Sequence, residues 1–303
     1  MGKWGRALDA AGIHEPRLRD DYGQLRKQAA AFKREIVFAA DLLLPNHLVP
    51  HLITAIAFMH ATDNLLDSGP VAQRKEAYTR WEHEVTGGLA DGRTGNPRLR
   101  PLLNSVTAYP VLRERVRDYL AGATTDLDFT GFATEADYQR YLDAYSLPAF
   151  MLGATLLGPD GDQTAYRAGC RLYIDASQRL DFVNDLAEDL ADDRLTLPEQ
   201  TLEQYGVARA DLERKRDLPA VRSLITGLLD HVDETLAESR AVIGHVPPAH
   251  QPMVRCLISL DELTVAAARA DISALLHRSA GLSKPAAARL LVRAYVEARR
   301  VRR

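Results

Sequence analysis

Apolar residues recur at intervals of three and four along most of the 303-residue chain, which is the spacing of one face of an α-helix. Alternating β-branched segments that would indicate strands are almost absent. Clusters of Gly and Pro interrupt the helical pattern at 68–70, 87–97, 158–161, 197–198 and 247–248. The sequence therefore predicts an all-α protein of about ten helices.

Several helix starts carry their own signals. Thr134 is followed three residues later by Asp137, the pattern of a capping box, and Ser283 precedes Pro285 in the manner of a cap before a first-turn proline. No stretch is long and polar enough to link two domains, and no repeat of fixed period is present. We expect one helical domain spanning residues 1–303.

A pair of aspartates follows a strongly apolar segment. Residues 48–59 are nearly all apolar, which predicts a buried helix, and Asp63 and Asp67 stand just beyond them. A spacing of four places both carboxylates on one helix face, where like charges repel by a few tenths of a kcal/mol. An acidic pair that emerges from a buried helix calls for a compensating partner.

A second acidic segment is richer. Six carboxylates fall between positions 181 and 193, namely Asp181, Asp185, Glu188, Asp189, Asp192 and Asp193. On a continuous helix, the first, second and fourth of these would spread over roughly 80° of one face. A solvated surface helix is the usual explanation of such a face, but its charges are normally interspersed with Lys or Arg, and here none precedes Arg194.

Two carboxylate pairs that include no Cys or His suit a hard cation such as Mg²⁺, which bridges to substrate phosphates. The residues alone thus predict a magnesium–diphosphate site in a helical bundle. His47 and His51 have the spacing of metal ligands, but no third ligand follows them, and we expect structural roles. Tyr138, Tyr141 and Tyr145 share a helix face, which favours a core stripe over a cavity lining. The chain has no Glu-x-x-His pair, glycine-rich nucleotide loop or Gly-x-Ser-x-Gly motif.

Composition and charge argue against several other classes of protein. The chain has 38 basic and 41 acidic side chains, a formal charge of −3, so it offers no strong field for nucleic acid or anionic lipid. No run of about 18 apolar residues and no secretory signal are present. Cys170 and Cys256 lack metal-site spacing and are expected to be buried, which indicates the cytoplasm. The arginine-rich segment 299–303 is predicted to be a solvated helix end. The oligomeric state is left open.

The order of motifs resembles the squalene/phytoene synthase family of isoprenyl diphosphate synthases over about residues 25–280. The similarity lies in Phe32, 43–45 and 63–67 at the first motif, and in Gln178, 185–189, Arg194, 197–199 and 205–207 at the second. It implies an all-helical domain around a central cavity. It also implies that Asp63, Asp67, Asp185 and Asp189 hold Mg²⁺, with Asp181 beside them, where the family more often has Asn.

Departures from the family pattern bear on the reaction. His60 and Asn184 stand where the family usually has Arg, and Ala31 replaces its early Ser. After the matching Tyr141, small residues are replaced by larger ones: Tyr145, Leu147, Pro148 and Phe150. Fewer guanidiniums weaken capture of a second diphosphate, and bulkier side chains reshape a tunnel for two long chains.

These departures favour transfer of a dimethylallyl group from its diphosphate to an aromatic, carbazole-like acceptor in secondary metabolism, as in a small group of squalene synthase-like enzymes. Head-to-head condensation of two polyprenyl diphosphates is the alternative, and cyclisation of one prenyl diphosphate the third. A helical scaffold without catalysis would also place acidic faces in water. It differs in predicting no stabilisation by Mg²⁺ with diphosphate.

The resemblance suggests a role for each remaining side chain. Lys33 and Arg194 are candidate cationic partners of the diphosphate, with His60 and Asn184 as weaker donors. Rings that could line the cavity and stabilise an allyl cation are those of Phe58, Tyr141, Tyr145 and Phe150. Tyr141 is the first candidate for guiding the acceptor or its proton.

Overall fold

The computed structural model describes residues 2–67, 69–127 and 129–302, apart from the side chains of Asp67 and Val71. Helices are the regular secondary structure of these residues, and no strand occurs among them. The prediction of an all-α fold is confirmed. The helices are shorter and more numerous than the sequence pattern predicted, because several are broken at turns that the apolar periodicity runs through.

Sixteen α-helices and three other helical turns make up the described fold. The first half contains α1 (Lys3–Ala10), α2 (Pro16–Phe32), α3 (Arg34–Leu43), α4 (Val49–Asp67), α5 (Val71–Asp91), α6 (Arg100–Ala108), α7 (Leu112–Leu127), α8 (Glu135–Tyr141), the π-helical turn η1 (Leu142–Ser146) and α9 (Leu147–Ala154). The second half contains α10 (Thr164–Asn184), α11 (Leu186–Ala191), α12 (Glu199–Gln204), α13 (Arg209–Glu213), α14 (Pro219–Ser239), η2 (Arg240–His245), α15 (Gln251–Ala270), η3 (Ile272–Leu276) and α16 (Lys284–Val301).

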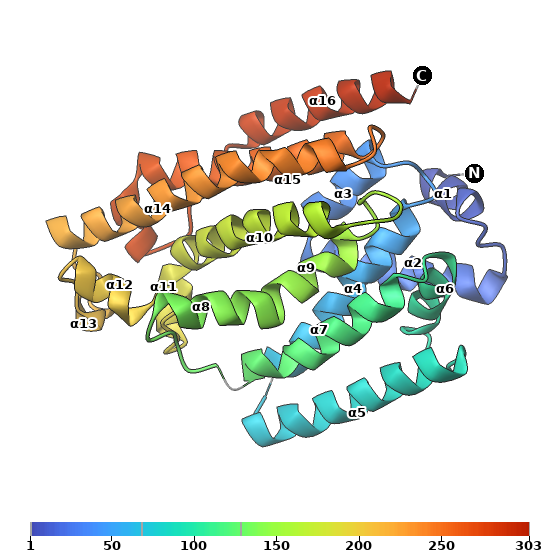
Figure 1. The fold of residues 1–303 in the computed structure, drawn as a ribbon, viewed down its shortest axis with the longest axis horizontal. Helices are drawn as coiled ribbons and strands as arrows, with labels where there is room; N and C mark the ends of the chain where they lie inside the picture. Colours follow the sequence, from blue (N-terminus) through green and yellow to red (C-terminus); the bar gives the residue numbers. More distant parts are fainter. Residues whose placement is uncertain (1, 68, 128, 303) are drawn as a thin grey trace.

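Helix α4 runs through the middle of the assembly, where it packs against α2, α3, α5, α6, α7 and α9 (Figure 1). Its first three turns are apolar on nearly every side, as expected for a helix that is covered all round. Ile53, Ala57 and Phe58 are among its buried residues. The predicted burial of residues 48–59 is therefore confirmed, and the acidic pair stands at the end of a core helix.

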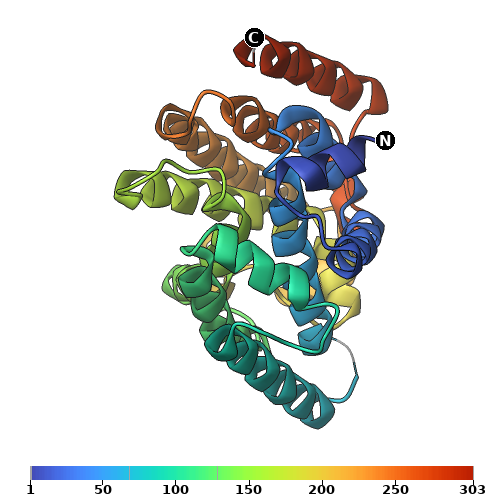
Figure 2. The ribbon, with the colours of Figure 1, turned by 90° about the vertical axis from the view of Figure 1, so that its right-hand side faces the viewer.

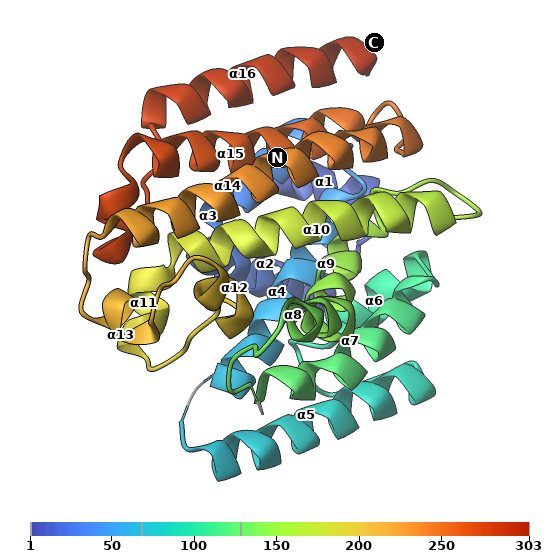
Figure 3. The same ribbon diagram turned by 60° about the vertical axis from the view of Figure 1, so that its left-hand side comes forward.

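Helices α10, α14 and α15 pack together beside this core, and α9 contacts both α4 and α10. Helix α16 packs against α15 and α3 at one edge of the molecule, while α5 lies at the opposite edge (Figures 2 and 3). Arg299 and Arg300 are exposed in the last turn of α16, as predicted for a solvated helix end. No helix in the described part of the chain is long and apolar enough to cross a membrane.

Local signals in the sequence have mixed outcomes. The capping box at the start of α8 is present, with Thr134 and Asp137 bonding each other's backbone N–H groups. Ser283 does precede α16, which begins with Lys284 and Pro285, but its side chain makes no capping hydrogen bond. Cys170 and Cys256 are buried and unlinked, as expected.

The segment from 181 to 193 is not the continuous acidic helix that its pattern predicted. Helix α10 ends at Asn184, Asp185 has φ −97° and ψ 10°, and α11 starts a new axis at Leu186. Asp193 then adopts the left-handed conformation with φ 57°. This break turns the carboxylates of the segment away from a single helix face, because each helix now presents its own.

Candidate active site

The first aspartate motif occupies an accessible face of a buried helix. Ile56, Met59, His60 and Asp63 are spaced by three and four residues on α4, and all four retain partial exposure although α4 is surrounded by other helices. Solvent therefore reaches this face of α4. The side chain of Asp67, the second member of the motif, lies outside the described residues.

Two phenols orient the Asp63 carboxylate. The Tyr119 and Tyr145 hydroxyls donate hydrogen bonds to Asp63 Oδ1, at 2.5 Å and 2.9 Å. Burial raises the pKa of both phenols, and the negative charge of Asp63 raises it further, so they remain protonated donors. Charge-assisted bonds of this kind fix the rotamer of the carboxylate.

The π-helical turn η1 places Tyr145 beside Asp63. It follows Tyr141 directly, and α7 approaches its backbone so closely that a Cβ built on Gly122 would lie 1.7 Å from the Ala144 carbonyl oxygen. A π turn adds about one residue per turn and so rotates the side chains that follow it. The rings of Tyr141 and Tyr145 consequently lie 5.4 Å apart between centroids.

The second motif is anchored by the segment after η3. Ser279 Oγ donates to Asp185 Oδ1 at 3.1 Å, and the Ala280 N–H donates to Asn184 Oδ1 at 2.7 Å. Thr196 Oγ1 donates to Asp189 Oδ2 at 2.9 Å. Each hydroxyl orients one carboxylate oxygen toward itself. The sequence analysis missed Ser279, Ala280 and Thr196, because nothing in their local pattern shows which distant segment they meet.

Asp181 is an accessible carboxylate near the end of α10. The side chain is exposed, yet burial by the surrounding protein raises its pKa to about 7. The charges of Asp261, Asp185 and Asp189 add to the increase in pKa, while that of Lys33 opposes it.

Asp261 on α15 is a further carboxylate that the sequence analysis missed. Burial raises its pKa to about 6, hydrogen bonds from Tyr173 and Ser177 oppose this, and its Oδ2 is buried without a partner. The ring of Phe150, predicted to line the cavity, lies 5.3 Å from that of Tyr173 and remains partly exposed. Phe150 and Asp261 thus flank Tyr173 on the side of α10 that holds Asp181.

Cationic side chains approach the motifs from two sides. Lys33 stands at the junction of α2 and α3, with its ammonium 5.3 Å from the Phe32 ring centroid. Arg194 follows α11 and stacks on Phe129, with the guanidinium carbon 5.0 Å from the ring centroid. Its Nη2 is 3.4 Å from Asp126 Oδ1, and its buried Nε–H has no hydrogen-bond partner. Arg194 therefore keeps donor capacity for an anion.

The two positions at which the family resemblance predicts Arg are occupied differently. The His60 ring stacks on Phe32 at 3.8 Å with an interplanar angle of 11°, and burial lowers its pKa, which favours a neutral imidazole. The side-chain oxygen of Asn184 accepts the hydrogen bond from the Ala280 backbone N–H described above. Neither residue supplies a positive charge near neutral pH.

The aromatic side chains divide into core and site. Tyr138 is buried, donates to the Asp175 carbonyl at 3.0 Å and belongs to the core, as its stripe predicted. Phe58 is also buried, packed between Trp81 and Tyr119 with ring centroids 5.9 Å and 6.0 Å away. Phe58 therefore packs in the core against Tyr119, whereas Tyr145, which bonds to Asp63, is partly exposed.

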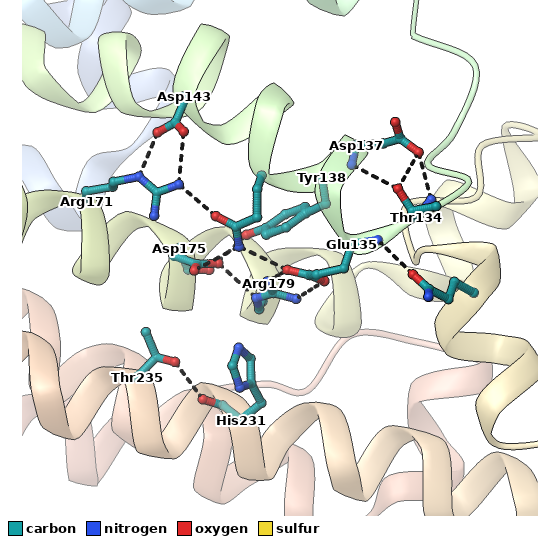
Figure 4. Close-up of polar contacts among 12 residues, drawn as sticks. Thr134, Glu135, Asp137, Tyr138, Asp143, Arg171, Asp175, Arg179, His231 and Thr235 are labelled. Atoms are coloured by element: carbon teal, nitrogen blue, oxygen red, sulfur yellow. Dashed lines mark hydrogen bonds and ion pairs between the residues drawn. The ribbon is translucent and has the colours of Figure 1, made fainter.

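A polar network links α8 to α10 (Figure 4). Arg179 on α10 is buried, and its guanidinium bonds both Glu135 and Asp175. Arg171 donates to Asp143 Oδ1 at 2.7 Å and to Gln139 Oε1 at 2.7 Å. These contacts hold the helix that leads into η1 against the helix that carries the second motif.

The carboxylates fit a divalent cation in chemistry, although they do not form a complete ligand set. Among the described residues, no three Asp, Glu, His or Cys side chains converge on one metal position. Burial and neighbouring carboxylates raise the pKa of Asp181 and Asp189, which a cation between them would reverse. The oxygen-only donors are those that Mg²⁺ prefers. His51 is buried and bonded to Ser105 at 2.8 Å, in keeping with a structural role.

Comparisons with known proteins identify relatives. The chain is 28% identical over 269 residues to the bifunctional protein CrtB/UppS of Streptomyces coelicolor, which covers 87% of this chain and 47% of that protein. It is 23% identical over 201 residues to the 15-cis-phytoene synthase of Synechocystis, covering 62% of this chain and 59% of the relative. The chain thus spans about half the length of these curated relatives.

Solved structures share the fold. The squalene synthase HpnC from Alicyclobacillus acidocaldarius superposes with a TM-score of 0.76 at 23% identity, covering 86% of this chain and 98% of that one. A dehydrosqualene synthase in complex with ligand gives 0.80 at 17% identity, covering 93% and 98%. The family model for squalene/phytoene synthase matches residues 34–286, which is most of the chain. The protein belongs to the squalene/phytoene synthase family.

Proposed function

We propose that the protein is a Mg²⁺-dependent prenyltransferase that condenses two polyprenyl diphosphates head to head. The observation that carries the proposal is the pair of oriented carboxylate motifs, on α4 and at the α10–α11 break, both accessible to solvent. Membership of the squalene/phytoene synthase family supports it, and the Synechocystis relative named above is a 15-cis-phytoene synthase.

Asp63, Asp67, Asp185 and Asp189, with Asp181 beside them, are the residues that would hold the metal. Held there, Mg²⁺ would offset the charge of the diphosphate and so make it a better leaving group. Tyr119 and Tyr145 keep Asp63 in place, and Ser279 and Thr196 do the same for the second motif. The carboxylates are therefore pre-organised before substrate enters.

Lys33 and Arg194 bind the negative charge of the diphosphate in this proposal. Once it leaves, an allyl cation remains, and the faces of Tyr141, Tyr145 and Phe150 stabilise it. Ile56 and Met59 share the accessible face of α4 with His60 and Asp63, and their apolar side chains limit the water around the cation.

A second candidate is transfer of a dimethylallyl group to an aromatic, carbazole-like acceptor in secondary metabolism. The occupants of positions 60 and 184 favour it, since a neutral His60 and an Asn184 bonded to backbone give no guanidinium for a second diphosphate. The family comparisons support head-to-head condensation better than this reaction. Cyclisation of one prenyl diphosphate is the third candidate, and no contact favours it.

Product analysis separates the candidates. The protein is incubated with Mg²⁺ and either farnesyl or geranylgeranyl diphosphate, or with dimethylallyl diphosphate and carbazole, and organic extracts are analysed by mass spectrometry. Head-to-head condensation predicts a coupled product with twice the carbon number. A prenylated carbazole, with no coupled product from the longer diphosphates, would instead establish the second candidate. Asp63→Ala is the inactive control in both arms.

A further inference from the structure

Asp126 is a buried carboxylate whose negative charge its own helix does not compensate. It lies in the last turn of α7, and its side chain is only 8% exposed. A carboxylate at a helix C-terminus faces the negative end of the helix dipole, and burial of a charge adds a larger penalty. Partners from elsewhere in the fold must therefore compensate it.

Two residues from different segments provide that compensation. The Tyr141 hydroxyl, at the end of α8, donates to Asp126 Oδ1 at 2.8 Å. Arg194 donates to the same oxygen at 3.4 Å and lies over Phe129, which follows Asp126 closely in the chain. Arg194 supplies the counter-charge, and Tyr141 supplies the shorter and stronger bond.

The bond has a consequence for Tyr141. Tyr145, 5.4 Å away between ring centroids, and Tyr119 both donate to Asp63. Burial, followed by the charge of Asp126, raises the pKa of Tyr141, so its phenol stays protonated. Asp126 thus gives Tyr141 an acceptor of its own, apart from the metal-binding motif. With its hydroxyl fixed at one end and its ring packed against Phe129, Phe132 and Phe182, the phenol has one orientation.

We infer that Asp126 is a positioning residue: it holds the ring of Tyr141 at the reacting centre by accepting its hydroxyl hydrogen bond, with Arg194 as its counter-ion. The inference rests on the proposed prenyltransferase function, because it assigns Tyr141 a place beside the allyl cation. It predicts that substitutions at either end of the Asp126–Tyr141 bond impair the same step.

The test compares Asp126→Ala, Asp126→Asn, Tyr141→Phe and the Asp126→Ala/Tyr141→Phe double variant. Mg²⁺-dependent diphosphate release from farnesyl diphosphate gives kcat and KM, and calorimetry with inorganic diphosphate and Mg²⁺ gives affinity without turnover. Asp126→Ala and Tyr141→Phe should each lower kcat by about tenfold, and the double variant should be no slower than Asp126→Ala, because each single change already removes the Tyr141–Asp126 bond. Asp126→Asn retains an acceptor oxygen and should stay within about threefold of wild type.

Diphosphate affinity should change by less than about twofold in Tyr141→Phe, which leaves the motif carboxylates and the Arg194–Asp126 pair untouched. Asp118→Asn is the matched control. Asp118 lies on the same helix as Asp126, and its carboxylate forms an ion pair with Arg115 at 2.8 Å instead of contacting Tyr141. Additive losses, an unimpaired Asp126→Ala, or an Asp126→Asn as slow as Asp126→Ala with weakened diphosphate binding would overturn the inference. Absence of diphosphate release by wild type with every prenyl diphosphate would instead refute the proposed function.

Discussion

Replacing Gly122 by alanine should force α7 away from the π-helical turn η1. The new Cβ would lie 1.7 Å from the Ala144 carbonyl oxygen and 2.8 Å from its carbon. Because both atoms belong to the backbone, no side-chain rotation relieves the overlap, and the two elements must separate by about 1.5 Å to approach van der Waals contact.

The magnitude follows from two opposing effects. Overpacking in a dense interior costs about 1–3 kcal/mol, and a backbone clash belongs at the upper end of that range. Alanine recovers up to about 1 kcal/mol through its better helix propensity. We expect a net loss of about 2 kcal/mol, which for a chain of this size lowers Tm by roughly 4 °C.

The displacement of η1 should also lower activity. The Tyr145–Asp63 hydrogen bond is 2.9 Å long, so a shift of η1 by about 1.5 Å would stretch it beyond bonding distance. We expect Gly122→Ala to lower kcat for diphosphate release by about tenfold. Gly87→Ala is the control: Gly87 is exposed on α5, nothing lies within 4 Å of its added Cβ, and the variant should be slightly stabilised with unchanged kcat. A Gly122→Ala protein that melts and turns over like wild type would refute the close-packing argument.

Three further substitutions test separate parts of the account. Burial lowers the pKa of His51 to about 4, below the value near 6.5 of the unfolded chain, so the stability that neutral His51 contributes is complete above pH 6.5 and is lost as the pH falls toward 4. The free energy of unfolding, measured by urea titration, should be about 2–3 kcal/mol lower at pH 4.5 than at pH 7 in wild type because of His51. The decrease should be smaller by about this amount in His51→Gln, and an equal decrease in both proteins would contradict the assignment. Thr134→Ala removes the capping box of α8 and should reduce the free energy of unfolding by about 1 kcal/mol, measured by urea titration, whereas Thr79→Ala on exposed α5 should not. Lys33→Ala should raise KM for farnesyl diphosphate by about tenfold with little change in Tm, and a KM equal to that of Lys27→Ala would remove Lys33 from the diphosphate site.

The sequence predicted those features that local patterning controls. The all-α class followed from apolar periodicity, the buried helix before Asp63 from its continuous apolar run, and the capping box from Thr134 and Asp137. Each depends on residues close together in the chain, so the physics that decides it is visible there. The assignment of one domain, the cytoplasmic location and the roles of individual site residues stay predictions.

Long-range contacts and irregular turns could not be predicted from local sequence patterns. The acidic segment was predicted as one helix, but it breaks at Asp185, where Ser279 and Ala280 from a segment about 95 residues later take up the side chains of the motif. The π turn after Tyr141 was also invisible, because it depends on how closely α7 approaches at Gly122. Asp126 and Asp261 had no local signal at all, and only burial distinguishes them from solvated carboxylates.

The most direct test of the account is whether the two aspartate motifs together hold a cation and a diphosphate. Thermal unfolding of wild type, Asp63→Ala and Asp185→Ala is measured with and without Mg²⁺ and inorganic diphosphate, with Asp118→Ala as the control carboxylate. Ligand at about one hundred times its Kd should stabilise wild type by about 2.7 kcal/mol. We predict that the Mg²⁺-dependent increase in Tm is present in wild type and Asp118→Ala and lost in both motif variants. An increase that survives in Asp63→Ala and Asp185→Ala alike would contradict the central claim.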